Sequence, residues 1–119
     1  MMEFNFKNNI PLDKRKNQCQ KLLIKNPNRI PVILEKDPKS KIKELKKTKF
    51  LIQKDFTINQ FIQMIRGLIE LSEYEAIFFV ARGKYTISGD KTMGQIYNIY
   101  KDKEDGFLYI TYSSELIYG

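Results

Sequence analysis

The chain has 119 residues, enough for one domain, and 42% of them are hydrophobic, which suffices for a single core. Its net charge of +7 is uneven: residues 1–54 carry fifteen Lys or Arg against five Asp or Glu, and residues 55–119 carry six against nine. With no histidine and one cysteine, the sequence excludes histidine-based nucleophilic catalysis, a structural zinc site and an internal disulfide.

The first predicted element is one amphipathic helix that ends before Pro27. Its apolar residues recur at helical spacing and are Leu12, Cys19, Leu22 and Leu23. Residues 29–35 then form a strand that is apolar on both faces, so both faces need cover. Pro31 lies within this strand and lacks an N–H, which argues against a fully paired central strand.

A second, short strand is expected at residues 49–53, with strongly basic flanks. Thr57 then opens a helix, and Gln60 three residues later completes a capping-box pattern. The buried stripe of this helix consists of Ile58, Phe61, Ile62, Ile65, Leu68 and Ile69. This is the strongest helical signal in the chain.

The remaining elements are short. Residues 76–80 form a buried strand, and a polar loop follows it through Ser88 and Gly89. Thr92 and Gln95 repeat the capping pattern and open a second, shorter helix. The turn signal of Asp105 and Gly106 precedes a last strand over residues 107–112, which is rich in aromatic and β-branched residues.

This order of elements predicts an α+β fold. It is the order of the ubiquitin-like β-grasp, a four-stranded mixed sheet packed on a central helix, here with an N-terminal helical extension that covers part of the other face. We expect a single domain over residues 1–119. Its parts are an N-terminal helical segment (1–27), the β-grasp core (28–113) and a C-terminal tail (114–119).

The sequence favours a cytoplasmic protein that is not an enzyme. Its longest apolar run, residues 76–81, is far shorter than the roughly 20 residues of a membrane span, and the N-terminus has no secretory signal. The carboxylates of Glu70, Glu73 and Glu75 straddle a predicted helix end and resemble a solvated cap rather than a catalytic pair. A basic pI near 9.4 keeps nucleic-acid binding as a minor alternative, with steep salt dependence as its signature, but we expect no nucleic-acid partner.

Several short segments carry a resemblance to a known family. They are DKRK (13–16), NRIPVI (28–33), EK (35–36), KFL (49–51), QF (60–61), IR (65–66), DGFLYITYS (105–113) and the terminal Gly119. Together, in this order and spacing, they resemble the autophagy-related protein 8 family. The animal members include GABA-receptor-associated protein and microtubule-associated protein light chain 3. The similarity runs over nearly the whole chain.

The resemblance implies a ubiquitin-like modifier of autophagy, preceded by two short helices. Gly119 matches the glycine that is conjugated to phosphatidylethanolamine on autophagosomal membranes, and the lipid is then the membrane anchor. The implied partners are activating and conjugating enzymes, a processing and delipidating cysteine protease, and cargo receptors. We expect no other cofactor, no metal and a monomer. The alternatives are a related modifier conjugated to protein lysines, and a Gly119 that merely marks where the sequence stops.

The resemblance also implies a docking surface for aromatic-x-x-aliphatic peptides beside the second strand. Its aromatic pocket maps to Gln18, Leu22, Pro31, Ile33, Lys49, Leu51 and Phe107. Its aliphatic pocket maps to Phe50, Ile52, Phe56, Phe61, Met64 and Arg66. Core packing is the alternative for each apolar residue, with equal weight at Phe61. Three residues depart from the family pattern: Gln18 replaces an acid, Phe50 a tyrosine and Gln53 a proline.

Overall fold

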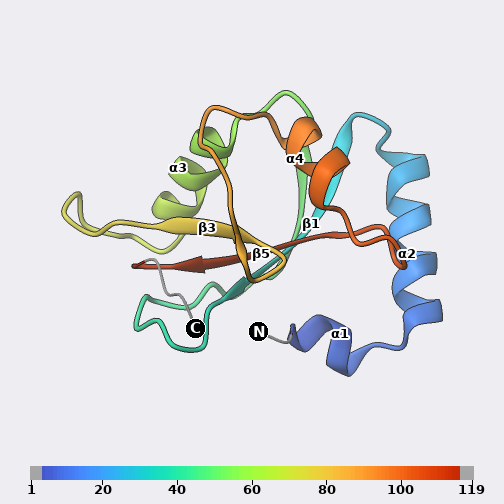
Figure 1. Ribbon diagram of the computed structural model, residues 1–119, viewed down its shortest axis with the longest axis horizontal. Helices are drawn as coiled ribbons and strands as arrows, with labels where there is room; N and C mark the ends of the chain where they lie inside the picture. Colours follow the sequence, from blue (N-terminus) through green and yellow to red (C-terminus); the bar gives the residue numbers. More distant parts are fainter. Residues whose placement is uncertain (1–3, 116–119) are drawn as a thin grey trace.

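The computed structural model describes residues 4–115 (Figure 1). This part of the chain contains four helices and five strands. They are α1 (Asn5–Asn9), α2 (Leu12–Lys25), β1 (Arg29–Lys36), β2 (Lys49–Gln53), α3 (Ile58–Leu68), β3 (Phe78–Ala81), β4 (Tyr85–Thr86), α4 (Met93–Tyr100) and β5 (Leu108–Ser113). Within the described range, no helix is long and apolar enough to cross a bilayer. Residues 116–119, including Gly119 and most of the predicted tail, lie outside that range.

All strands belong to one mixed sheet with the order β2-β1-β5-β3-β4. At its centre β1 and β5 run parallel, with Val32 opposite Leu108. The pairs β1–β2, β5–β3 and β3–β4 are antiparallel. This arrangement confirms the predicted α+β, ubiquitin-like fold and leaves β2 at an edge of the sheet.

The sheet has one strand more than the four that the sequence predicted. The extra strand, β4, lies in the segment expected to be a polar loop and pairs Thr86 with Val80. A tight turn returns the chain onto β3, because Arg82 and Gly83 both adopt positive φ, 55° and 76°. Two successive positive-φ residues are typical of hairpin turns, and Lys84 N donates to Ala81 O at 3.1 Å across this one.

Both predicted capping boxes are present. The Thr57 hydroxyl accepts a hydrogen bond from Gln60 N (3.1 Å), while the Gln60 side chain accepts one from Thr57 N (2.8 Å). The same reciprocal pair links Thr92 and Gln95 at the start of α4. These bonds satisfy N–H groups that have no partner inside the helix, which fixes where α3 and α4 begin.

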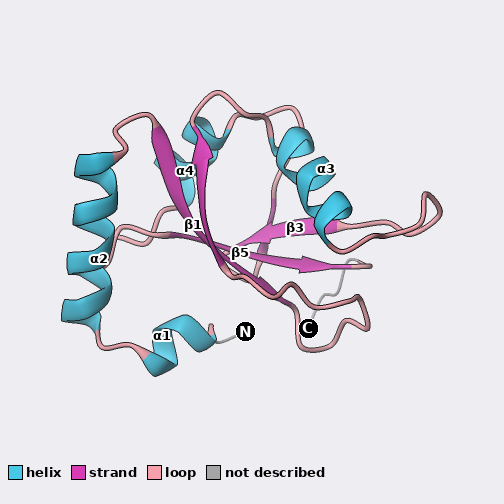
Figure 2. Ribbon diagram, turned by 180° about the vertical axis from the view of Figure 1, so that it is seen from behind, coloured by secondary structure: helices cyan, strands magenta, loops and turns pink. Residues whose placement is uncertain are grey.

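Helices cover the two faces of the sheet separately (Figure 2). Alternate residues of β1 divide between them: Ile30, Val32 and Leu34 join the main core with α3 and α4. Ile33 faces the other way, into a second cluster that Cys19 of α2 and Phe4 complete. The predicted cover of the second face by the N-terminal segment is therefore confirmed.

The N-terminal segment differs in detail from the single helix predicted by periodicity. It forms two helices, as the family resemblance implied, because Pro11 interrupts the chain between α1 and α2. Leu12, expected on the apolar face, is 39% exposed. Arg15, three residues further along the helix, is buried instead.

Pro31 is compatible with a central strand because of where its nitrogen points. Leu34 N donates to Thr48 O and Lys54 N to Asn28 O, so the even-numbered residues of β1 bond to β2. Pro31 therefore directs its nitrogen toward β5, and pairing with β5 begins only at Val32. The N–H group that Pro31 lacks would lie just before the first residue pair between β1 and β5, so no hydrogen bond between these strands is lost.

Candidate functional site

The outer edge of β2 offers unpaired main-chain groups. The main-chain groups of Phe50 and Ile52 face Val32 and Ile30 of β1 and bond to them. The alternate residues of β2, Lys49 and Leu51, therefore direct their N–H and C=O groups away from the sheet. An edge of this kind can accept one more strand through main-chain hydrogen bonds. Side chains of β2 alternate, so each face of the sheet contributes one set of contacts beside this edge.

The first set of predicted residues is brought together on the α2 face. Ile33, Phe107 and Leu22 belong to the second cluster, and the strand register places Pro31 opposite Leu51. Gln18 and Leu51 are half-buried, Pro31 is buried and Lys49 is exposed. Lys49 Nζ donates to Gln18 Oε1 at 3.0 Å, which joins α2 to the edge strand. Ile33 and Phe107 are 0% exposed and lie beneath this set as core, so only Gln18, Leu22, Leu51 and Lys49 offer appreciable surface.

Sequence reasoning missed Phe6, which completes this surface from α1. Its ring centroid lies 5.1 Å from that of Phe107 in an edge-to-face arrangement, and Lys49 Nζ lies 5.7 Å from it. A five-residue helix is too short for periodicity to reveal its packed face. Phe6 therefore adds an aromatic ring to this predicted set that the family pattern did not supply.

The second set of predicted residues lies on the α3 face and is mostly core. Phe61 is 0% exposed, and its ring stacks edge-to-face against Phe50 and Phe79 at 5.9 and 5.1 Å. Ile52 is buried with them, whereas Phe56 and Met64 are half-buried at the margin of the main core. Only the last two have surface to offer a ligand without rearrangement.

Arg66, the remaining member of that set, is engaged elsewhere. Its guanidinium donates to the main-chain carbonyls of Glu75 (2.6 Å) and Ser72 (2.8 Å). It thereby fastens the connection between α3 and β3. The structure does not place its charged end at the edge of β2.

A buried ion pair that the sequence gave no sign of sets the position of Phe107. Arg15 Nε donates to Asp105 Oδ2 at 2.9 Å, and both residues are nearly inaccessible, 8% and 3% exposed. Asp105 also accepts from Phe107 N (2.9 Å) and from the Tyr109 hydroxyl. Arg15 further donates to the carbonyls of Lys7 and Ile10. The ion pair thus holds three parts together: Arg15 bonds α2 to the α1–α2 junction, and Asp105 bonds Arg15 to the start of β5.

This network also sets the protonation of its neighbours. Burial, and then the charge of Asp105, raise the pKa of the Cys19 thiol to about 12. Burial and the hydrogen bond to Asp105 likewise raise the pKa of the Tyr109 hydroxyl. Both groups are therefore neutral at physiological pH, and Cys19 has no thiolate with which to act as a nucleophile.

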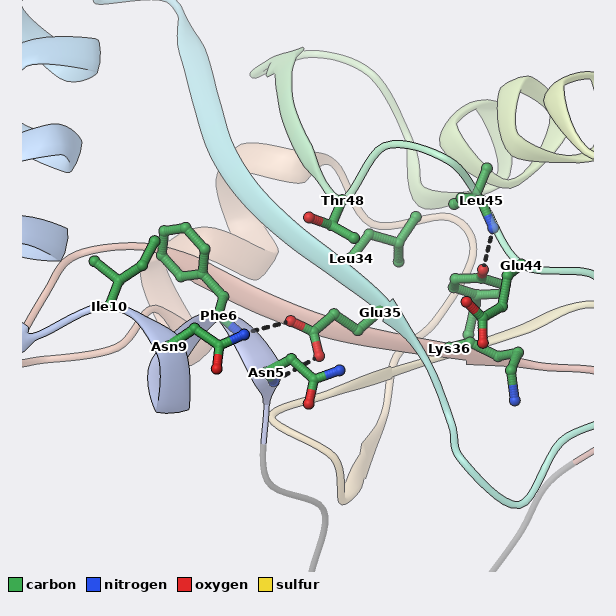
Figure 3. Close-up of a pocket in the computed structure, with 11 residues that line it drawn as sticks. Asn5, Phe6, Asn9, Ile10, Leu34, Glu35, Lys36, Glu44, Leu45 and Thr48 are labelled. Atoms are coloured by element: carbon green, nitrogen blue, oxygen red, sulfur yellow. Dashed lines mark hydrogen bonds between the residues drawn. The ribbon is translucent and has the colours of Figure 1, made fainter.

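A cavity of about 270 Å³ lies between α1, β1 and the connection that leads to β2 (Figure 3). The Glu35 carboxylate lies in its wall and accepts hydrogen bonds from Asn5 N (2.8 Å) and Phe6 N (3.0 Å). On the other side, Leu45 N donates to the Tyr112 hydroxyl at 2.8 Å. Glu35 caps α1 and so holds Phe6 over Phe107. Residues 4–115 contain no group of three or more potential metal ligands.

Similarity to known proteins extends over the whole chain. A family model described as "Autophagy protein Atg8 ubiquitin like" matches residues 14–119. The chain is 42% identical over 118 residues to autophagy-related protein 8 of Candida glabrata. This alignment covers 99% of the present chain and 98% of the Candida protein. The crystal structure of Trypanosoma brucei ATG8 superposes with a TM-score of 0.89 at 33% identity, and covers 99% of this chain and 100% of that one.

Proposed function

Because the chain belongs to the Atg8 family of ubiquitin-like autophagy proteins, we propose that it is a non-enzymatic modifier conjugated through Gly119 to phosphatidylethanolamine. It docks aromatic-x-x-aliphatic motifs of cargo receptors along β2. The observation that carries the docking proposal is the open edge of β2, flanked by Leu51 and Lys49 on one face and by Phe56 and Met64 near the other.

The surroundings of this edge suit the two halves of such a motif. Leu22 and Leu51 offer apolar surface beside Phe6, with Pro31 and Phe107 packed beneath, for an aromatic side chain. Lys49 lies where a charged residue preceding that aromatic would arrive, so an acidic flank is favoured. A small edge site of this kind binds with roughly micromolar affinity, and many copies on one membrane raise the avidity.

Lipid conjugation supplies what the described fold lacks, a means of stable membrane attachment. The proposed partners are the activating and conjugating enzymes, which carry out the chemistry, and a cysteine protease that exposes or releases Gly119. A glycine has no side chain, so an extended tail that ends in it can enter a narrow active site. The protein is proposed to move from the cytoplasm to autophagosomal membrane when lipidated.

Substituting Gly119→Ala is expected to abolish lipid conjugation. The test combines the chain with activating and conjugating enzymes, ATP and phosphatidylethanolamine liposomes, and detects the adduct by mass spectrometry. Gly67→Ala is the matched control, since a Cβ at Gly67 meets nothing within 4 Å. An adduct on a protein lysine instead of the lipid supports the alternative modifier. No adduct on the wild type with demonstrably active enzymes refutes conjugation altogether.

Substituting Gln18→Glu is expected to lower the affinity for peptides with an acidic flank by about two- to fivefold, the range of an exposed ion pair. A carboxylate at this position would neutralise Lys49 Nζ, which now lies 3.0 Å from a neutral amide oxygen. Isothermal titration with paired peptides, identical except for acidic or neutral flanks, measures the effect. Gln20→Glu, at an exposed position on the same helix, is the control. Equal losses for both peptides would contradict the role of Lys49.

A further inference from the structure

The connection between β1 and β2, residues 37–48, is a basic surface segment of the fold. Residues 37–48 contain five lysines against two acids, a net charge of +3. The lysines are Lys39, Lys41, Lys43, Lys46 and Lys47. Lys47 Nζ lies 4.9 Å from the centre of the Phe50 ring and so belongs to the β2 edge. Lys39, Lys41 and Lys43 come earlier in the chain, between the end of β1 and Lys46.

These three lysines are presented to solvent by the residues between them. Ser40 and Ile42 are 5% and 6% exposed, and Ile42 belongs to the main core. Lys39, Lys41 and Lys43 alternate with them and are exposed. The buried residues pin the loop, so the three ammonium groups point outward from one short segment.

The same loop is tied to the end of β5. Ser40 Oγ accepts hydrogen bonds from Ser114 N (3.1 Å) and Ile42 N (3.2 Å), and Asp37 N donates to Tyr112 O at 2.9 Å. Lys36 Nζ closes the base of the loop through Ser40 O. The loop therefore lies beside the point where the chain leaves the sheet (Figure 1).

This point is close to Gly119 along the chain. Glu115 is the last described residue, and four residues at no more than about 3.6 Å each span at most roughly 14 Å. A lipid attached at Gly119 would therefore hold a bilayer surface within reach of the lysine loop. Screening at physiological salt acts over about 8 Å, so lysines that approach the headgroups would feel their charge.

We propose that Lys39, Lys41 and Lys43 form a contact with the anionic headgroups of the bilayer that carries the chain. The proposal rests on the proposed attachment through Gly119. A lysine near an anionic membrane surface contributes about fivefold to the binding constant. The three together are expected to favour anionic over neutral membranes strongly.

The test attaches the chain to vesicles without the conjugation enzymes, so failure of the proposed function would not affect it. A Gly119→Cys variant is coupled to maleimide-bearing phosphatidylethanolamine, and Cys19, 1% exposed, does not compete for the reagent. Acetylation of each lysine is then measured by mass spectrometry. On vesicles of phosphatidylcholine with phosphatidylserine, the three loop lysines are expected to lose reactivity relative to phosphatidylcholine alone. The exposed Lys16, Lys21 and Lys25 of α2 serve as internal controls.

Two charge-reversal variants sharpen the result. In the uncoupled full chain at low salt, K39E/K41E/K43E is expected to lower the binding constant for phosphatidylserine vesicles, measured by sedimentation, by at least about tenfold. K16E/K21E/K25E makes the same change in net charge on α2 and should lose much less. Equal losses, or equal protection of loop and helix lysines, would overturn the proposal. So would a loop variant that binds vesicles normally but loses acidic motif peptides, because the loop would then serve peptide recognition.

Discussion

Asp105→Ala is expected to lower the free energy of unfolding by about 3–5 kcal/mol, the usual result of removing one partner from a buried ion pair. The substitution leaves the Arg15 guanidinium buried without its carboxylate and removes the acceptor used by Phe107 N and the Tyr109 hydroxyl. Urea denaturation of the full chain measures the loss. Glu104→Ala, at the exposed neighbouring position, should change stability by less than about 0.5 kcal/mol.

A double-mutant cycle separates the ion pair from the other bonds of Asp105. Arg15→Met removes the charge and keeps much of the side-chain volume. If the pair acts as a unit, the double variant is less destabilised than the sum of the two single variants. A strictly additive cycle, or a loss below about 1 kcal/mol for Asp105→Ala, would show that the network does not hold α2 against β5.

Phe61→Ala is expected to cost about 3–5 kcal/mol of folding stability, as for other fully buried aromatic residues. Its side chain is 0% exposed and packs between Phe50 and Phe79, so truncation leaves a cavity in the main core. Phe56→Ala is the comparison, because Phe56 is half-buried at the margin of the same core. It should lose about 1–2 kcal/mol.

The pair also separates core from binding surface. Thermal and urea unfolding report stability, and titration with an aromatic-x-x-aliphatic peptide under conditions where each variant remains folded reports docking. For a given loss of folding stability, we expect Phe56→Ala to lower the affinity for the peptide more than Phe61→Ala does. A Phe61→Ala variant with near wild-type stability and no peptide binding would assign Phe61 to the aliphatic pocket instead.

Local signals predicted most of the fold. The capping boxes at Thr57 and Thr92 involve residues only three apart, so sequence alone located both helix starts. The sequence did not predict the β3–β4 turn, because its first positive-φ position is occupied by Arg82. Arginine seldom adopts positive φ, whereas glycine or asparagine at this position would have indicated a hairpin.

Long-range interactions were beyond such signals. Arg15 and Asp105 are 90 positions apart, and nothing in either local segment announces their pairing. The burial of Arg15 on the helix face follows from that pairing. Family resemblance named candidate docking residues, and the structure divides these candidates into buried core, as for Phe61, and available surface, as for Leu51.

The central place of β5 has a consequence for how the chain acquires its fold. This strand, residues 108–113, lies between β1 and β3, although it is the last of the sheet to be synthesised. Until it emerges from the ribosome, β1–β2 and β3–β4 are two separate hairpins whose inner edges have no partner. The sheet can therefore close only once residues 108–113 have been synthesised. A translation product interrupted before them would expose unpaired strand edges that can bind chaperones or aggregate.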